Sequence, residues 1–228
     1  MVSEETQFET DVIETSGGDL EITFLGHGTL MFMFGGEVIH VDPYSKVADY
    51  AQLPKADLIL ITHGHGDHLD AYALAHIRTE ETDVVVSPGG AGQIQDAAVM
   101  RNGDVREVRG LSIEAVPAYN IVHKRDNGQP YHPKGEGNGY VITFGDKRVY
   151  IAGDTENIPE MKDLEDIHIA FLPMNLPYSM TPEMVADAAQ MFEPQILYPY
   201  HYGDTDTAKL VKLLRGGEDI KVRIRDMA

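Results

Sequence analysis

Short apolar runs separated by glycine and acidic residues dominate the first third of the chain. Runs of strand length occur at "LEITFL", "LMFMF" and "EVIHVD" within residues 20–42, and "GGE" at Gly35–Glu37 predicts a turn between the last two. The run "DLILIT" at 57–62 has apolar residues in succession rather than in alternation. That pattern is typical of a strand covered on both faces. After a loosely ordered start over residues 1–18, the chain is therefore expected to form a meander of strands.

Farther along the chain, strand-like runs alternate with runs of helical spacing. Helices are predicted at 70–77, 91–100, 181–192 and 205–217. The third has the clearest start, because Thr181 suits the N-cap and Pro182 the first helical position. The strands predicted between and after them are "DVVVS", "VREV", "LSIEAVPAY", the hairpin "GYVITFGDKRVYIAGD", "IHIAFLPM" and "QILYPY". A meander followed by alternating strands and helices predicts two sheets packed together with helices outside.

The composition narrows the possible partners of this chain. Its 228 residues, most simply one domain over 1–228, carry 37 acidic and 18 basic side chains and a formal net charge of −19. A binder of nucleic acid or of anionic lipid normally presents a basic patch, so both classes are disfavoured. The remaining expectation is a small-molecule partner; the oligomeric state is left open, and a homo-oligomer is compatible with the sequence.

The residues that are missing are also informative. The chain has no cysteine, which excludes disulfides, thiolate zinc sites and cysteine nucleophiles, so a metal site would have to use imidazole and carboxylate groups. No apolar run approaches the roughly 20 residues that span a bilayer. The opening "MVSEETQFETD" is polar and acidic and does not read as a signal peptide. A cytoplasmic protein is therefore favoured, with a removed export signal left open.

The segment "THGHGDH" at 62–68 concentrates chemistry directly after the buried strand. His63, His65, Asp67 and His68 lie within six residues of a chain that has only ten histidines. In an extended segment the first three side chains point the same way, and a turn into the next helix would bring the fourth alongside. Imidazole nitrogen and carboxylate oxygen are ligands that zinc accepts. Intervening glycines allow the backbone to approach an ion closely. The spacing predicts a metal site.

The pattern HxHxDH resembles the metallo-β-lactamase superfamily, and further motifs follow in that family's order. "IHVDP" at 39–43, "IAGDT" at 151–155 and "YPYHYG" at 198–203 are similar to its early Asp-Pro strand end, its Gly-Asp motif and its last histidine strand. The resemblance implies an α/β fold, a four-layer αββα sandwich with a metal site at one edge. "GHGTLMF" and "THGHGDHLD" are similar to the branch of ascorbate-6-phosphate lactonase-like and N-acylphosphatidylethanolamine phospholipase D-like hydrolases.

The resemblance also implies a set of ligands for two divalent ions, most simply zinc, although such sites accept manganese, iron or nickel. His63 and His65 would hold the first ion. Asp67, His68 and His201 would hold the second, and Asp154 would bridge both. Asp67 and Asp154 are the candidate catalytic residues, because either carboxylate can orient the attacking water or take its proton.

The third ligand of the first ion departs from the family pattern. Many members have a histidine just after a Pro-Ala pair, whereas this chain reads "VPAYN" and places Asn120 there. The following loop offers His123 and His132 as substitutes. His132 is preferred, because the surrounding "YHPKGEGNGY" is rich in residues that constrain a loop. All three residues remain open at this point.

The leading interpretation is a metal-dependent hydrolase that acts on an ester-like bond, either a lactone or a phosphodiester. Divalent ions lower the pKa of bound water to roughly 7, and two of them with their ligands would leave a positive charge that attracts an anionic substrate. The alternatives are a metal-stabilised binding module without catalysis and a redox member of the same fold. A nuclease is disfavoured by the acidic composition.

A few other residues have a weaker case. His27 lies at a predicted strand end, and two interpretations of it are open: it lines the site, or it occupies a turn without a role. Lys134 offers a cation for a substrate anion, and Tyr119 and Tyr178 offer hydroxyl groups for a developing negative charge. For these last three, solvation or packing is the simpler interpretation.

Overall fold

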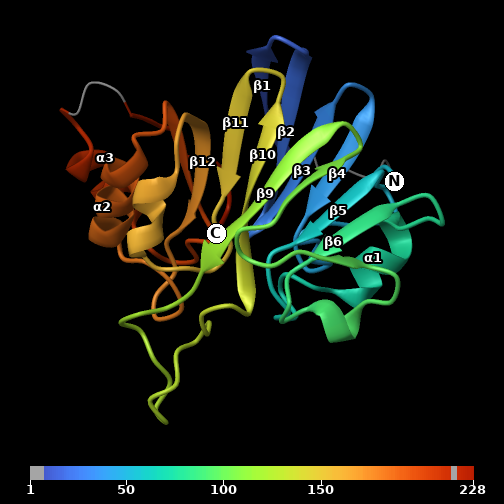
Figure 1. Ribbon diagram of the computed structural model, residues 1–228. Helices are drawn as coiled ribbons and strands as arrows, with labels where there is room; N and C mark the ends of the chain where they lie inside the picture. The colour runs from blue at the N-terminus through green and yellow to red at the C-terminus, as the bar shows by residue number, and fades with distance from the viewer. Residues whose placement is uncertain (1–7, 217–219) are drawn as a thin grey trace, which may run out of the picture.

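Two seven-stranded sheets pack face to face in the computed structural model, which describes residues 8–216 and 220–228 (Figure 1). The first sheet follows chain order: β1 (Glu9–Thr15), β2 (Gly18–Gly26), β3 (Thr29–Phe34), β4 (Glu37–Val41), β5 (Leu58–Ile61), β6 (Asp83–Val86) and β7 (Ala98–Val99). The second sheet also follows chain order: β8 (Val105–Val108), β9 (Leu111–Ala118), β10 (Gly137–Phe144), β11 (Lys147–Ile151), β12 (Ile167–Pro173), β13 (Ile196–Tyr200) and β14 (Lys221–Val222).

Helices cover the outer faces of both sheets. On the first sheet, α1 (Ala71–Ile77) buries its apolar side chains against β5 and β6. On the second, α2 (Pro182–Phe192), α3 (Thr207–Leu213) and the 3₁₀ helix η2 (Pro159–Asp163) share one apolar cluster with β12 and β13. Figure 1 shows α2 and α3 on one side of the paired sheets and α1 on the other. The predicted αββα sandwich is confirmed.

The strand β5 has the double burial that its sequence predicts. Leu58 and Leu60 belong to the core between the sheets, whereas Ile59 and Ile61 pack against α1. All four side chains are fully buried. The inter-sheet core is rich in aromatic rings, and the stacked pair Phe171 and Tyr198, with ring centroids 5.1 Å apart, is an example. This rigid core holds the ends of the central strands in fixed positions.

The central strands run parallel in each sheet, and this brings their polar C-terminal flanks to one edge of the sandwich. Strand β4 pairs in parallel with β5, and β12 pairs in parallel with both β11 and β13. Asp42, His63, Asp154 and His201 each follow the end of one of these strands. Because the carboxyl ends of parallel strands meet at one edge, residues far apart in sequence converge there.

The expectation of a loosely ordered start is wrong for residues 9–18. Strand β1 pairs along its whole length with β2, and the two form a hairpin. Its apolar pattern is weak because its side chains are largely exposed, and much of its anchoring is polar: Asp11 accepts hydrogen bonds from Arg223 and Arg225. Those partners lie more than two hundred residues away, so the local sequence gives no sign of them. Residues 1–7 lie outside the described part of the chain.

The helix predicted at 91–100 is also wrong. This segment contains only the 3₁₀ turn η1 (Ala91–Gln93) and then β7, which pairs in parallel with β6. Hydrogen bonding to the free edge of β6 outweighs the weak helical preference of this segment. The start of α2 is as predicted: Thr181 Oγ1 accepts a hydrogen bond from the backbone N–H of Met184 at 3.2 Å. Gly35 and Gly36 form the predicted turn, and both have positive φ.

Candidate metal centre

The loop after β5 folds into a tight turn that gathers its histidines. The backbone N–H groups of His68 and Leu69 both donate to the carbonyl of His65, at 3.0 and 2.8 Å. Gly64 is required here, because a Cβ at this position would lie 2.8 Å from the carbonyl oxygen of Gly89. The turn therefore depends on the glycine between the first two histidines, as the motif suggested.

Three histidines form what we call the first group: His63, His65 and His132. One ring nitrogen from each lies within 4.8 Å of the others. His63 and His65 come from the loop after β5, whereas His132 comes from the long loop between β9 and β10. His63 and His132 are buried and His65 is exposed.

A second group comprises His27, Asp67, His68 and His201, again with ligand atoms within 4.8 Å of one another. Asp67 Oδ2 lies 3.6 Å from His201 Nε2 and 3.9 Å from His68 Nε2. Its fourth member, His27, comes from the turn between β2 and β3. Three residues of this group were predicted to share an ion, and the structure brings them together.

Asp154 lies between the two groups with one carboxylate oxygen toward each. Its Oδ1 is 3.6 Å from His68 Nε2 and 3.7 Å from His201 Nε2. Its Oδ2 is 3.2 Å from His132 Nε2 and 3.9 Å from His63 Nε2. A carboxylate in this position has the geometry needed to bridge two ions.

Among the three candidates left open for the first group, only His132 points into it. Asn120 faces away, with its Oδ1 2.7 Å from His132 Nδ1. His123 also faces elsewhere, since its Nδ1 lies 2.7 Å from a carboxylate oxygen of Glu156. Asn120 thus lies behind the histidine that takes the place expected for a ligand.

Polar groups hold the outer nitrogens of the histidine rings. Asp42, which is fully buried, accepts from the backbone N–H and hydroxyl of Thr62, and one of its oxygens lies 2.8 Å from His68 Nδ1. The Thr62 hydroxyl is 3.0 Å from His63 Nδ1. Such partners fix ring orientation and direct Nε2 toward the centre.

The donors present fit divalent cations. Within residues 8–216 and 220–228, three buried atoms that face this centre have no hydrogen-bond partner: His68 Nε2, His201 Nε2 and Asp154 Oδ1. Leaving buried polar atoms unpaired is costly, so their convergence indicates a ligand that satisfies all three at once. Imidazole and carboxylate groups suit zinc and also other first-row divalent ions.

The two groups differ in their protonation. Burial, with the nearby His68, holds the pKa of His63 well below its usual value, so this ring is neutral at pH 7. Burial would also lower the pKa of His68, but the carboxylates of Asp154 and Asp42 outweigh it and raise that pKa to about 9. The pKa of Asp154 is held well below its usual range, because surrounding histidines, led by His201, outweigh the effect of burial.

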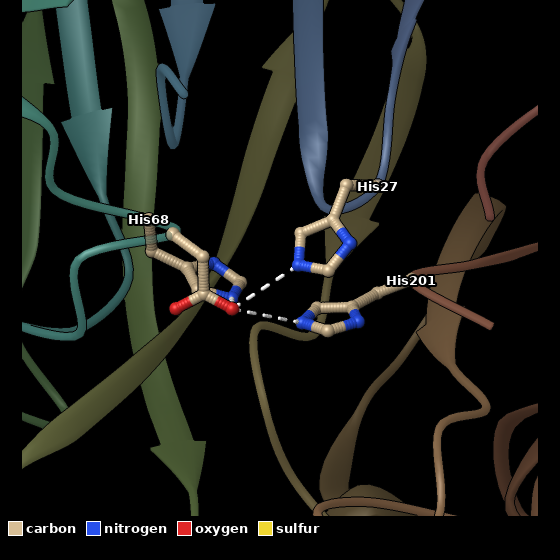
Figure 2. A group of neighbouring side chains, drawn as sticks. His27, His68 and His201 are labelled. Carbon is tan, nitrogen blue, oxygen red and sulfur yellow. Dashed lines mark hydrogen bonds and ion pairs between the residues drawn. The ribbon is translucent and has the colours of Figure 1, made fainter. Parts of the chain in front are cut away.

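His27 is the site residue that the sequence alone failed to assign. Figure 2 shows its ring beside that of His201, and the ring centroids lie 3.7 Å apart. Its Nε2 lies 3.1 Å from Asp67 Oδ2. The only sequence signal for this role was the pair of glycines that flank His27. The structure shows why one of them is needed: a Cβ at Gly28 would lie 2.8 Å from the ring of His68, next to His27 with its positive φ of 54°.

Two other candidates have partners within the protein. Lys134 is paired with Glu160 at 2.5 Å, and the Tyr119 hydroxyl donates to the same carboxylate at 2.9 Å. Neither is therefore a free contact for a substrate anion.

A cavity of about 120 Å³ opens beside the first group and is lined in part by Tyr131 and Pro133. Tyr178 packs edge-on against Tyr131, with centroids 5.0 Å apart.

The chain and its fold have counterparts among known proteins. A family profile described as the beta-lactamase superfamily domain matches residues 21–201. A UPF0173 metal-dependent hydrolase of Methanopyrus kandleri is 34% identical over 197 residues, covering 81% of this chain and 84% of its own length. The chain therefore belongs to the metallo-β-lactamase superfamily and, within it, to the UPF0173 family of metal-dependent hydrolases.

Solved structures agree with this assignment. A crystal structure of a candidate metal-dependent hydrolase from Parabacteroides distasonis has a TM-score of 0.93 and 49% identity, covering 97% of this chain and all of that one. Igni18, a metallo hydrolase from Ignicoccus hospitalis, has a TM-score of 0.74 at 24% identity and shares the fold. The superfamily resemblance seen in the sequence is confirmed, while the narrower lactonase-like and phospholipase-like branch stays a prediction. None of the helices within the described residues has the length and apolar character needed to cross a bilayer.

Proposed function

We propose that this protein hydrolyses an ester-like bond, a lactone or a phosphodiester, in a small anionic substrate by means of two divalent ions. The observation that carries the proposal is the position of Asp154, whose two oxygens face the two groups separately. The first group and Asp154 would hold one ion, and Asp67, His68, His201 and Asp154 the other. Ions bound in this way lower the pKa of water to roughly 7 and polarise the bond that is attacked.

The protein's own residues supply the proton handling. Asp67 is half-exposed, and its pKa is held below its usual range because the nearby rings of His201 and His27 outweigh burial. It therefore stays ionised at neutral pH and can orient a water or accept its proton. Asp154 is likewise ionised, but it is buried, which suits a bridging role better than that of a proton carrier.

The surroundings suggest what kind of substrate fits. Lys134, a cation in the same loop as His132, is already paired with Glu160, so attraction for an anion would come from the ions. Four exposed apolar side chains lie on two segments beside the site: Ile121, Val122, Leu176 and Tyr178. The segments are joined where Asn120 Nδ2 donates to the carbonyl of Tyr178 at 2.9 Å. We expect these side chains to contact the uncharged part of the substrate.

The test combines metal analysis with a substrate panel. We expect the purified protein to carry about two divalent ions per chain and to turn over a lactone or a phosphodiester, but not a β-lactam. Complete chelation should abolish turnover and added metal should restore it. Turnover that persists after complete metal removal would refute the proposal.

A pair of histidine variants separates catalysis from mere metal-stabilised folding. His65→Ala should stay folded and lose turnover, because His65 is exposed and lies in a loop outside the apolar core. His76→Ala is the matched control, since His76 lies on α1 and its ring contacts the backbone carbonyl and the ring of Tyr72. A His65→Ala variant that unfolds, together with no turnover on the panel by the parent, would favour the binding-module alternative.

A further inference from the structure

A single buried carboxylate organises the start of the loop that carries His132. Glu156 is 1% exposed and accepts hydrogen bonds from three successive backbone N–H groups, those of Ile121, Val122 and His123, each at 2.7 Å. Buried carboxylates are costly unless several donors surround them. This one therefore fixes the conformation of the chain immediately after Asn120.

The same carboxylate also orients the side chain of Asn120. The amide Nδ2 donates to Glu156 Oε1 at 3.1 Å and to the carbonyl oxygen of Tyr178 at 2.9 Å. A carboxylate and a backbone carbonyl can only accept, so the amide nitrogen has to face them. The orientation of Asn120, which is often ambiguous for this residue type, is thereby determined.

With the nitrogen fixed, the amide oxygen must face His132. Asn120 Oδ1 accepts from the backbone N–H of His132 at 2.8 Å and lies 2.7 Å from its ring Nδ1. Because an amide oxygen cannot donate, the ring Nδ1 must carry a hydrogen. The other nitrogen, Nε2, then faces Asp154 and the rest of the first group.

We propose that Glu156 and Asn120 are positioning residues that hold His132 with Nδ1 protonated and Nε2 directed at the first ion. Glu156 fixes the amide, and the amide fixes the ring. Asn120 thus occupies the place of the expected histidine ligand and supports the histidine that replaces it. The inference rests on the metal centre of the proposed function and is independent of which bond is hydrolysed.

The first test needs no variant and no metal. In metal-free protein labelled with ¹⁵N in histidine, at a pH above 8, the ring of His132 should be protonated at Nδ1, as read from the nitrogen shifts and couplings of the ring. A His132 ring that carries its only hydrogen on Nε2 would overturn the proposal.

The second test compares metal binding in matched variants. Asn120→Leu keeps the size of the side chain but can neither donate nor accept, so one ion should bind about 10- to 100-fold more weakly, as is usual when a ligand's partner is lost. Glu156→Gln, which turns an amide N–H toward backbone donors, should have a smaller effect of the same kind. In both, the affinity for the other ion should be unchanged.

The control is Asn127→Leu, the same replacement at an exposed position of the same loop. It should bind both ions as the parent does. If Asn120→Leu also binds both ions as tightly as the parent, the inference is wrong. A parent that binds two ions yet hydrolyses nothing on the panel would sink the proposed reaction and leave the inference standing, because neither readout uses a substrate.

Discussion

The two groups of the metal centre are built from the same kinds of ligand but are held by different parts of the fold. In the second group, His201 directly follows the core strand β13, and the ring of His68, from the loop after β5, contacts the buried carboxylate of Asp42. In the first group, His132 comes from a loop and its ring contacts a neutral amide, that of Asn120. One half of the centre therefore depends on the core and the other on the order of a loop.

The same difference appears in the charge of the rings. A carboxylate behind His68 and others in front raise its pKa to about 9, whereas His63, with only a hydroxyl group behind it, has a lowered pKa. His68 thus keeps a proton at neutral pH when no ion is bound, and His63 does not. The comparison teaches that equal ligands need not compete equally with protons for a metal.

The largest effect is expected at Asp154, because its carboxylate faces both groups and so does not belong to only one of them. Asp154→Ala removes both inward oxygens at once, so turnover should fall by about a thousandfold or more, equivalent to about 4 kcal/mol. Total bound metal should fall below that of the parent. Kinetics and metal analysis measure this, with Asp163→Ala on the exposed surface of η2 as control. Retained binding of both ions would show that Asp154 does not link the groups.

A weaker but selective effect is expected from the anchor of the second group. Asp42→Asn removes the charge behind His68, so the second ion should bind about 10- to 100-fold more weakly while the first is unaffected. Asp49→Asn, at an exposed turn where the carboxylate caps Ala51, is the matched control. Chelator competition measures both affinities. Equal weakening of both ions would mean that Asp42 supports the whole edge rather than one group.

The third prediction concerns pH. Below about pH 9 an ion entering the second group must displace the proton of His68, so its affinity should fall about tenfold for each unit from pH 8 to pH 7. The first group should change little, because burial and neighbouring histidines lower the pKa of both His63 and His65. Calorimetry in buffers of different ionisation enthalpy, with His132→Ala and His201→Ala to isolate each group, measures the protons released. Equal numbers of protons released when metal binds to the first and to the second group would contradict the predicted difference in pH dependence.

The smallest effect is expected at His27. Its Nε2 contacts Asp67 Oδ2, and its outer nitrogen makes no hydrogen bond within the described residues that would fix the ring, unlike the rings of His68 and His132. His27→Gln keeps a polar group near the carboxylate, so turnover should fall only about three- to tenfold, or roughly 1 kcal/mol. Steady-state kinetics measures this loss. A fall as large as that of Asp154→Ala would make His27 an essential ligand.

Much of the fold was readable from the sequence because its signals are local. The continuous apolar run at 57–62 predicted a strand with two buried faces, and Thr181–Pro182 predicted the start of α2. The two failures have non-local causes. Strand β1 has no apolar pattern, and Asp11 anchors it to arginines far along the chain. In residues 91–100, pairing of β7 with the edge strand β6 outweighs the helical spacing of the sequence.

For the centre itself, the sequence determined which residue types were available and the order in which they occur: the cluster at 63–68, then Asp154 and His201. Only the tertiary structure selected His132 over His123, turned Asn120 toward the back of that ring, and brought His27 against Asp67. The physical reason is that a ligand's role depends on which nitrogen faces the centre and what holds the other. Those contacts form between segments far apart in the chain, when parallel strands end at one edge of the sandwich.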